Sequence, residues 1–351
     1  MSIMYYLHCE MVTFYDRYVR LGSNEQEKLR GYRDTNIERL KKGLTKLDYK
    51  TPVRAVGQGS YTMHTMVQHP DNDYDLDNAV IFAREDLPSD ALRARQRVLA
   101  GVEAGGGNFE RPPEARTNAV TVWYAEGYHI DLAVYRCYQD MFGNEVIEHA
   151  GVEWTRRDPS EITDWFRDEV VRQSPSPDRG ATVKEKQMRR IVQLLKTFSK
   201  SRSSWNLPGG LLISVLVAEC YRPDWNRDDL ALYNTMAAIH TRLQWSTEIR
   251  NPVDPSLKLT YKDEYVNQTI RFKVKLEQAL DWLTPLHAHE CDKITAYQSW
   301  NNVFQHEYWS ELVSGAELQK SAKFVTSTGA LYVAKPAEPS IESPSHRFYG
   351  D

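Results

Sequence analysis

Apolar and charged positions alternate along the first fifty residues at the spacing of an amphipathic helix. Apolar side chains recur every three or four residues among charged neighbours, at Leu29, Tyr32, Ile37, Leu40 and Leu44. This pattern predicts a long helix near the N-terminus that packs on the rest of the protein through its apolar stripe.

After Pro52 the pattern changes to short apolar runs separated by turn residues. β-branched and aromatic residues dominate these runs, which is typical of strands. The predicted strands cover residues 53–56, 74–82, 119–124 and 128–135. Between the second and third, residues 89–104 have helical spacing and end at three successive glycines. The sequence therefore predicts a mixed sheet with helices against it, over about residues 50–150.

From Pro159 onward the periodicity is helical. The predicted amphipathic helices cover residues 160–173, 183–202, 210–221, 227–243, 262–283 and 310–325. Residues 334–351 contain three prolines and few apolar residues, which favours a flexible tail. We therefore expect an α+β fold of two lobes: residues 1–155 form an N-terminal helix and a mixed-sheet lobe, 156–330 a helical lobe, and 331–351 the tail.

Composition narrows the class of protein. The 351 residues are about twice the usual size of one compact domain, which agrees with two lobes. With 44 Lys and Arg against 48 Asp and Glu, the net charge of −4 does not favour coating of DNA, although a locally basic cleft could hold a nucleoside triphosphate. No apolar run approaches the ~20 residues that span a bilayer. The four cysteines are far apart. We expect a cytoplasmic protein with neither a membrane partner nor a sequence-specific nucleic-acid partner.

Two aspartates, Asp75 and Asp77, stand one residue apart in a predicted strand, and Asp131 stands in another. Alternate residues of a strand face the same side, so Asp75 and Asp77 project together while Leu76 and Val80 face the opposite way. Asp131 can reach the same point if its strand is adjacent in the sheet.

Carboxylates held this close repel one another unless a cation lies between them. Oxygen ligands favour hard ions, and Mg²⁺ is the usual one where phosphates complete its shell. Three carboxylates around two ions would suit two-metal phosphoryl or nucleotidyl transfer. The alternatives are an exposed strand edge for Asp75 and Asp77 and a structural cap for Asp131. The apolar neighbours of all three favour the metal site, because unpaired acids are costly to bury.

A Gly-Ser step precedes the paired aspartates. Gly59 lacks a Cβ, so backbone N–H groups can approach a phosphate closely, and Ser60 adds a hydroxyl donor. Residues 61–67 are expected to open a helix whose N-terminus favours an anion. A Gly-Ser pair alone is weak evidence, but its spacing to the three acids makes the combined pattern strong.

This combination resembles the polymerase β-like nucleotidyltransferase superfamily, and within it the cGAS/DncV-like nucleotidyltransferases (CD-NTases) of bacterial CBASS anti-phage systems. The residues that carry the resemblance are Gln58-Gly59-Ser60-Tyr61, Asp75-Leu76-Asp77 and the segments 129–135, 158–166, 191–196 and 205–214. The resemblance covers about residues 50–220 and implies a bilobed nucleotidyltransferase fold, in which a mixed-sheet catalytic lobe packs against a helical bundle.

The resemblance also implies roles for individual residues. Asp75, Asp77 and Asp131 would be the catalytic acids and hold two Mg²⁺ ions. The residues implied to bind the nucleotide are Gln58, Gly59, Ser60, Tyr61, Lys196 and Ser214. For Lys196 a nearly as good interpretation is a solvated helix face, and the loop before Ser214 differs in length from that of the family.

The activity implied is that of a cyclic oligonucleotide synthase. It would condense nucleoside triphosphates (ATP, with GTP or a pyrimidine nucleotide as further candidates) into a cyclic di- or trinucleotide second messenger with release of pyrophosphate. A protein of the same defence system could regulate it. Two alternatives stay open: a nucleotidyltransferase that modifies a small molecule, a protein or an RNA end without cyclising, and an inactive scaffold that binds nucleotide. The same three acids serve both enzymes.

Two further clusters favour structural roles. His287, His289, Glu290 and Cys291, with His306 later, lack the paired spacing of a structural zinc site. The aromatic residues of the segment 300–309 are expected to be core rather than a platform for bases.

Overall fold

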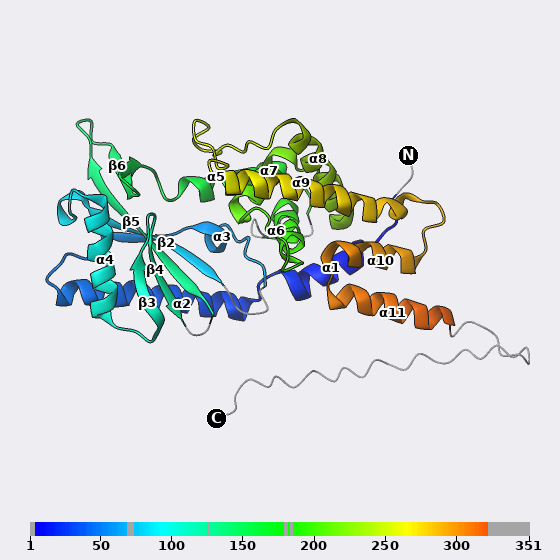
Figure 1. Ribbon diagram of the computed structural model, residues 1–351, viewed down its shortest axis with the longest axis horizontal. Coiled ribbons are helices and arrows are strands. Elements are labelled where there is room, and N and C mark those ends of the chain that lie inside the picture. Colours follow the sequence, from blue (N-terminus) through cyan, green and yellow to red (C-terminus); the bar gives the residue numbers. More distant parts are fainter. Residues whose placement is uncertain (1–3, 69–73, 125–126, 179–181, 183–184, 322–351) are drawn as a thin grey trace, which may run out of the picture.

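The computed structural model describes residues 4–68, 74–124, 127–178, 182 and 185–321. A mixed β-sheet with its covering helices lies beside a helical lobe (Figure 1). This arrangement confirms the predicted α+β fold. The predicted tail, residues 331–351, lies outside the described residues.

The described part of the chain forms a seven-stranded sheet in the order β1-β2-β5-β4-β3, with β6 paired to β5 and β7 paired to β6. Its strands are β1 (Arg54–Gly57), β2 (Asp75–Ala83), β3 (Phe109–Ala115), β4 (Val120–Tyr124), β5 (His129–Gln139), β6 (Glu145–Ala150) and β7 (Trp154–Arg156). Strands β2 and β5 are parallel, and the other pairs are antiparallel. The four predicted strands correspond to β1, β2, β4 and β5.

One face of the sheet is apolar and covered by two helices, α2 (Ser23–Lys46) and α4 (Ala91–Gly105). Leu76 and Val80 of β2 and Ile130 of β5 are fully buried there with Leu40 of α2 and Val98 of α4. Burying a side chain of this size stabilises the fold by about 1.5–3 kcal/mol. The helix predicted from the first fifty residues is α2. The opposite face of the same strands carries the aspartates and looks toward the helical lobe.

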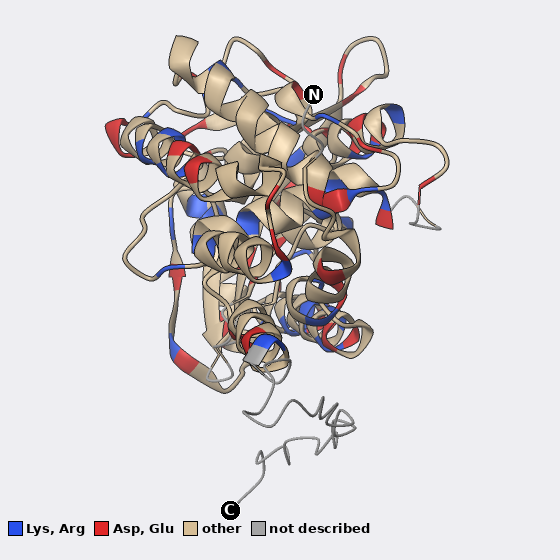
Figure 2. Ribbon diagram, turned by 90° about the vertical axis from the view of Figure 1, so that its right-hand side faces the viewer, with Lys and Arg blue, Asp and Glu red and all other residues tan. Residues whose placement is uncertain are grey.

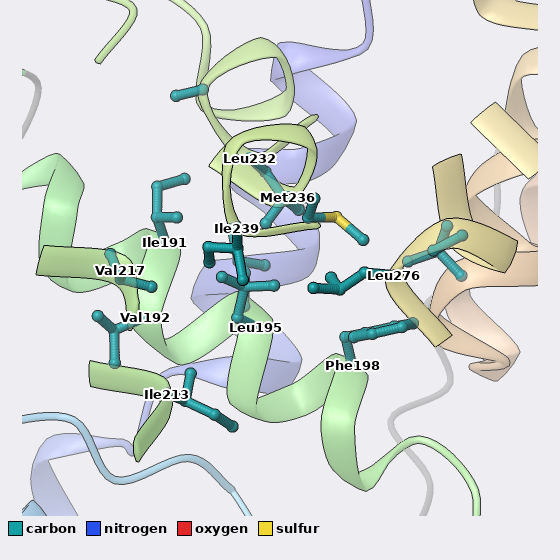
Figure 3. Close-up of a cluster of buried hydrophobic side chains, with 14 of the residues drawn as sticks. Ile191, Val192, Leu195, Phe198, Ile213, Val217, Leu232, Met236, Ile239 and Leu276 are labelled. Atoms are coloured by element: carbon teal, nitrogen blue, oxygen red, sulfur yellow. The ribbon is translucent and has the colours of Figure 1, made fainter. Parts of the chain in front are cut away.

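The helical lobe packs around α6, which is apolar along one side and buried along nearly all its length. Figure 3 shows Ile191, Leu195 and Phe198 of this helix among side chains from its neighbours. The helices of the lobe are α1 (His8–Phe14), a π-helix (Tyr15–Val19), α5 (Glu161–Gln173), α6 (Gln187–Lys200), α7 (Gly210–Cys220), α8 (Asp228–Trp245), α9 (Asp263–Leu283), α10 (Lys293–Phe304) and α11 (Glu307–Ser321). Charges of both signs are interspersed over this lobe (Figure 2).

Residues 4–19 pack into the helical lobe rather than onto the sheet. Met11 and Phe14 of α1 are buried in the helical core, and the Arg227 guanidinium donates hydrogen bonds to the backbone carbonyls of Met4 and Tyr5. The predicted boundary, which placed these residues in the sheet lobe, is therefore wrong for them. An apolar periodicity indicates that a face is buried, but it does not indicate which element covers that face.

The aromatic cluster set aside at the C-terminal end has the expected character. Trp300 and Trp309 are fully buried, as predicted for core residues. Among the described residues, the group of His, Cys, Asp and Glu side chains close enough to hold an ion is Asp75, Asp77 and Asp131, and it includes none of the residues 287–291. No helix in the described part of the chain has the length and apolar character that a membrane crossing requires.

Candidate active site

The register of β2 and β5 brings the three aspartates together. The two strands run parallel with Asp77 opposite Asp131 and Asp75 opposite His129. One carboxylate oxygen from each of Asp75, Asp77 and Asp131 lies within 4.8 Å of the other two. The expectation that Asp131 reaches the paired acids from an adjacent strand is thus met by the geometry.

The surroundings of Asp77 and Asp131 disfavour the ionised forms of their carboxyl groups. Burial raises the pKa of Asp77 to about 7, and repulsion from the Asp75 and Asp131 carboxylates adds to the rise. Burial also raises the pKa of Asp131, and Asp75 adds to that rise while the Arg116 guanidinium opposes it. His129 Nε2 lies 3.3 Å from Asp75 Oδ1. Positive charge placed beside Asp77 and Asp131 would favour the ionised forms of both carboxyls.

The donor set fits a divalent cation such as Mg²⁺. Asp131 Oδ1 is buried without a hydrogen-bond partner among the described residues, and so is the hydroxyl of Thr121, which lies opposite Asp131 on β4. Carboxylate oxygens are the ligands that hard cations prefer. A cation would satisfy this buried carboxylate oxygen of Asp131.

The Gly-Ser turn is fitted against this cluster. Gly59 has φ +65°, and a Cβ at this position would overlap the Asp77 carboxylate, so only glycine is accommodated. The backbone N–H of Gln58 donates to the Asp77 carbonyl at 2.9 Å. The helix that follows, α3 (Gly59–Thr62), is a single turn. The prediction of a helix over residues 61–67 was therefore wrong, because His64 adopts a left-handed conformation that ends it.

A cavity of about 550 Å³ lies over the acids, between the sheet and the helical lobe. Its lining includes Gln58, Gly59, Ser60, Asp75, Asp77, Asp131, Pro159, Lys196, Lys200, Gly210 and Ser214. The Gln58 side chain spans the two lobes, since its Nε2 donates to the Tyr135 hydroxyl and to the Pro159 carbonyl. Five of the six residues implied to bind nucleotide thus line one cavity with the three acids.

Lys196 of α6 is buried, not solvated. Its ammonium donates to the carbonyl and the hydroxyl of Thr65, both at 2.9 Å, and none of the described acids forms an ion pair with it. Burial lowers the pKa of Lys196 to about 7, with a further contribution from Lys200. The ammonium has three donors, so one remains for a ligand in the cavity. The solvated-face interpretation is wrong, because α6 is covered on nearly all sides.

Ser214 and Tyr61 are placed differently from the other residues of the set. Ser214 lines the cavity, but its hydroxyl donates to the Gly210 carbonyl within its own helix. Tyr61 is not among the residues that line the cavity: its ring packs against the apolar cluster under the sheet, and its hydroxyl donates to the Gln26 carbonyl. Side chains at adjacent positions of a tight turn point in different directions. The sequence motif does not show in which direction each of them points.

Two further residues, Thr65 and Thr121, belong to the site although the sequence did not predict them. Thr65 holds Lys196, and Thr121 faces Asp131. Thr121 stands in a predicted strand. The alternation of side chains along that strand could have placed it on the same face of the sheet as Asp131. Thr65 has no such signal, because its contact joins residues 131 positions apart.

Comparison with known proteins agrees with this geometry. Residues 53–135 match the family described as cyclic GMP-AMP synthase DncV-like, nucleotidyltransferase domain. The chain carries a DncV-like nucleotidyltransferase domain. The match spans the Gly-Ser turn and all three aspartates, and it confirms the resemblance to cGAS/DncV-like nucleotidyltransferases drawn from these residues.

Solved structures extend the similarity beyond the DncV-like domain. E. coli MS115-1 CdnC with ATP superposes with a TM-score of 0.61 at 15% identity, covering 88% of this chain and 99% of CdnC. Bradyrhizobium diazoefficiens CdnG with GTP gives 0.63 at 15% identity, covering 88% and 96%. A Vibrio cholerae DncV mutant with ATP, GTP and 5MTHFGLU2 gives 0.65 at 15% identity, covering 88% and 99%. At this identity the likeness establishes a shared fold, including the helical lobe.

Proposed function

We propose that this protein is a Mg²⁺-dependent nucleotidyltransferase that joins nucleoside triphosphates into a cyclic oligonucleotide. The observation that carries the proposal is the convergence of Asp75, Asp77 and Asp131 beside a Gly-Ser turn, in a cavity walled by a DncV-like domain and a helical lobe. A scaffold that only binds nucleotide has no use for three converging acids, two of which, Asp77 and Asp131, have a pKa raised by burial and by a neighbouring carboxylate.

Five residues of the cavity take a defined part in the proposed reaction. Asp75, Asp77 and Asp131 would hold the Mg²⁺, which when bound lowers the pKa of an attacking hydroxyl and neutralises charge on the phosphates. Ser60 and Lys196 bind the donor triphosphate, with the ammonium of Lys196 as the positive charge next to it. Asp131 orients the ribose hydroxyl of the acceptor toward the donor α-phosphate.

Cyclisation requires the linear product to bind again with its own triphosphate at the Ser60–Lys196 end. A DncV structure contains such a species, the linear intermediate 5′ pppA(3′,5′)pG. Structures of CdnC with ATP and of CdnG with GTP support purine nucleotides as substrates here. A CdnC:HORMA complex supports a regulatory protein partner. We propose the same setting for this chain: a cytoplasmic enzyme of anti-phage defence, with the sheet lobe and the helical lobe as the two walls of the cleft.

The test is to incubate the protein with Mg²⁺ and the four NTPs, treat the products with phosphatase, and measure their intact mass. We expect a phosphatase-resistant cyclic product and pyrophosphate release, both lost in the Asp75→Ala plus Asp77→Ala variant. Linear products alone would favour the non-cyclising transferase. Absence of pyrophosphate release with every NTP would favour the nucleotide-binding scaffold.

A further inference from the structure

A row of polar and aromatic side chains leads from the three acids to the outer edge of the sheet. Across the paired strands, Asp75 lies opposite His129, His129 opposite Trp123, and Trp123 opposite Arg111. Directly opposite residues of neighbouring strands point to the same face. The row therefore runs along the face that carries the site, from β2 through β5 and β4 to the edge strand β3.

Two arginines meet the Trp123 ring at the end of this row. The guanidinium carbon of Arg111 lies 3.6 Å from the ring centroid, and that of Arg116 lies 4.8 Å from it. Arg111 forms no ion pair or side-chain hydrogen bond with any residue that the structure describes, and Arg116 has a 3.5 Å contact with Glu114, both side chains being more than half exposed. A guanidinium held flat on an aromatic ring keeps its N–H donors directed outward in its own plane.

The backbone of Arg116 places the arginine pair next to the cavity. The backbone N–H of Arg116 donates to the carbonyl of Ala119, which lines the cavity. Neighbouring strands are about 4.8 Å apart, so Arg111 on β3 stands two strand spacings from the strand of Asp131. The pair thus lies outside the cavity but at its rim.

The geometry of in-line transfer assigns a ligand to this position. The attacking and leaving oxygens lie on opposite sides of the α-phosphate. The donor pyrophosphate leaves toward Ser60 and Lys196, on the β1 side of the acids, so the acceptor approaches from the side of β4 and β3. The acceptor nucleotide has a triphosphate of its own, which the three carboxylates repel and which requires cations on that side.

We infer that Arg111 and Arg116, held by Trp123, bind the triphosphate of the acceptor nucleotide. This inference rests on the proposed function and adds a second phosphate site to it, separate from the donor site at Lys196. The arginine pair selects an acceptor that still carries its triphosphate, and so favours a nucleoside triphosphate over a nucleoside or an RNA 3′ end as the first acceptor.

The test uses substrates that can play only one role. A 2′,3′-dideoxynucleoside triphosphate serves as donor, because it has no hydroxyl with which to attack. Either α,β-methylene-ATP, which cannot donate, or adenosine serves as acceptor. In both reactions the acceptor oxygen bonds to the donor α-phosphorus, pyrophosphate leaves and the hydroxyl proton passes to solvent. The dinucleotide is quantified by mass spectrometry over a range of acceptor concentrations.

We expect Arg111→Ala and Arg116→Ala each to raise the KM for α,β-methylene-ATP about tenfold, the size of a charge-assisted hydrogen bond, with little change in the KM for adenosine. Arg111→Lys, which keeps the charge but not the planar fork, should lie between. The matched control is Arg84→Ala. Arg84 also stacks on an aromatic ring, that of Tyr138 at 4.5 Å, but it follows the end of β2 that lies far from Asp75.

An equal loss with both acceptors would show that the arginines only support the fold, and it would overturn the inference. So would unchanged KM values in both alanine variants. Both of these results leave the wild-type transfer activity intact, which separates them from failure of the proposed function. Absence of transfer in the wild-type protein would refute the proposed function and this inference together.

Discussion

The two faces of strands β2 and β5 affect stability in opposite ways although they share the same backbone. On one face Leu76, Ile130 and Leu132 are fully buried against helices, and every contact adds to stability. On the other face Asp77 and Asp131 are brought together against their mutual repulsion. One face keeps the sheet folded, and the other uses that rigidity to hold an arrangement that lowers stability until a cation binds.

The largest effect is expected from Asp77→Asn. The change keeps the shape of the side chain but removes one of the charges that hold Mg²⁺, so pyrophosphate release should fall by about 10³-fold. The measurement is kcat at saturating NTP and Mg²⁺. Activity within a factor of ten of the wild type would contradict the role of this face.

A substitution on the apolar face should lower stability and leave the activity nearly unchanged. Ile130→Ala removes a fully buried side chain and should lower the free energy of unfolding by about 2–4 kcal/mol. At temperatures where the variant is folded, kcat should stay within a few-fold of the wild type, because no substrate contact changes. Denaturant unfolding measures the free energy of unfolding, and an assay at 15 °C measures kcat. A loss of kcat as large as that of Asp77→Asn would refute the division of the two faces.

The same Asp77→Asn change should stabilise the metal-free protein. In the folded state the pKa of Asp77 is raised from 3.8 to about 7, so the wild type loses stability as pH rises from about 4 to about 7 and is level above that. The variant lacks this loss and should be more stable by about 2–4 kcal/mol at pH 8 and equal at pH 4. Urea unfolding in EDTA at both pH values measures it. A destabilised variant at pH 8 would contradict the account.

A smaller effect concerns the helical wall of the cavity. Burial lowers the pKa of Lys196 to about 7, so at pH 8 this amine is mostly neutral in the free protein. A bound triphosphate favours its charged form, and nucleotide binding at pH 8 should take up close to one proton. Calorimetric titrations in buffers of different ionisation enthalpy measure the uptake, with Lys196→Met as the comparison. Equal uptake in wild type and variant would exclude Lys196 as the phosphate-binding cation.

The elements that the sequence predicted are those whose signal is local. Strands β2 and β5 have apolar runs interrupted by acids at alternate positions, and from these the convergence of the acids was foreseen. Strand β3 was missed because its sequence, with Pro112 and Pro113, lacks the alternation of a strand, yet prolines are tolerated on an edge strand. Helix α10 was not predicted because its buried aromatic residues were interpreted as an apolar cluster and not as one face of a helix.

The parts of the site that escaped the sequence depend on contacts between distant segments. Lys196 and Thr65 meet only because α6 packs over the turn after Ser60. Helix α1 is held in the helical lobe by partners more than 200 residues away, such as the Tyr308 hydroxyl, which donates to the Glu10 carbonyl. Periodicity shows that a face is buried, but the element that covers it is decided by packing of the whole chain.

The central claim, that Asp75, Asp77 and Asp131 form a divalent cation site at which nucleotides react, is tested most directly by Mn²⁺ binding. Electron paramagnetic resonance can count the Mn²⁺ ions bound to the wild type and to Asp77→Asn, with and without a non-reactive NTP analogue. The account predicts Mn²⁺ binding that the nucleotide strengthens in the wild type and that is lost in the variant. Equal Mn²⁺ binding by the two proteins would contradict it.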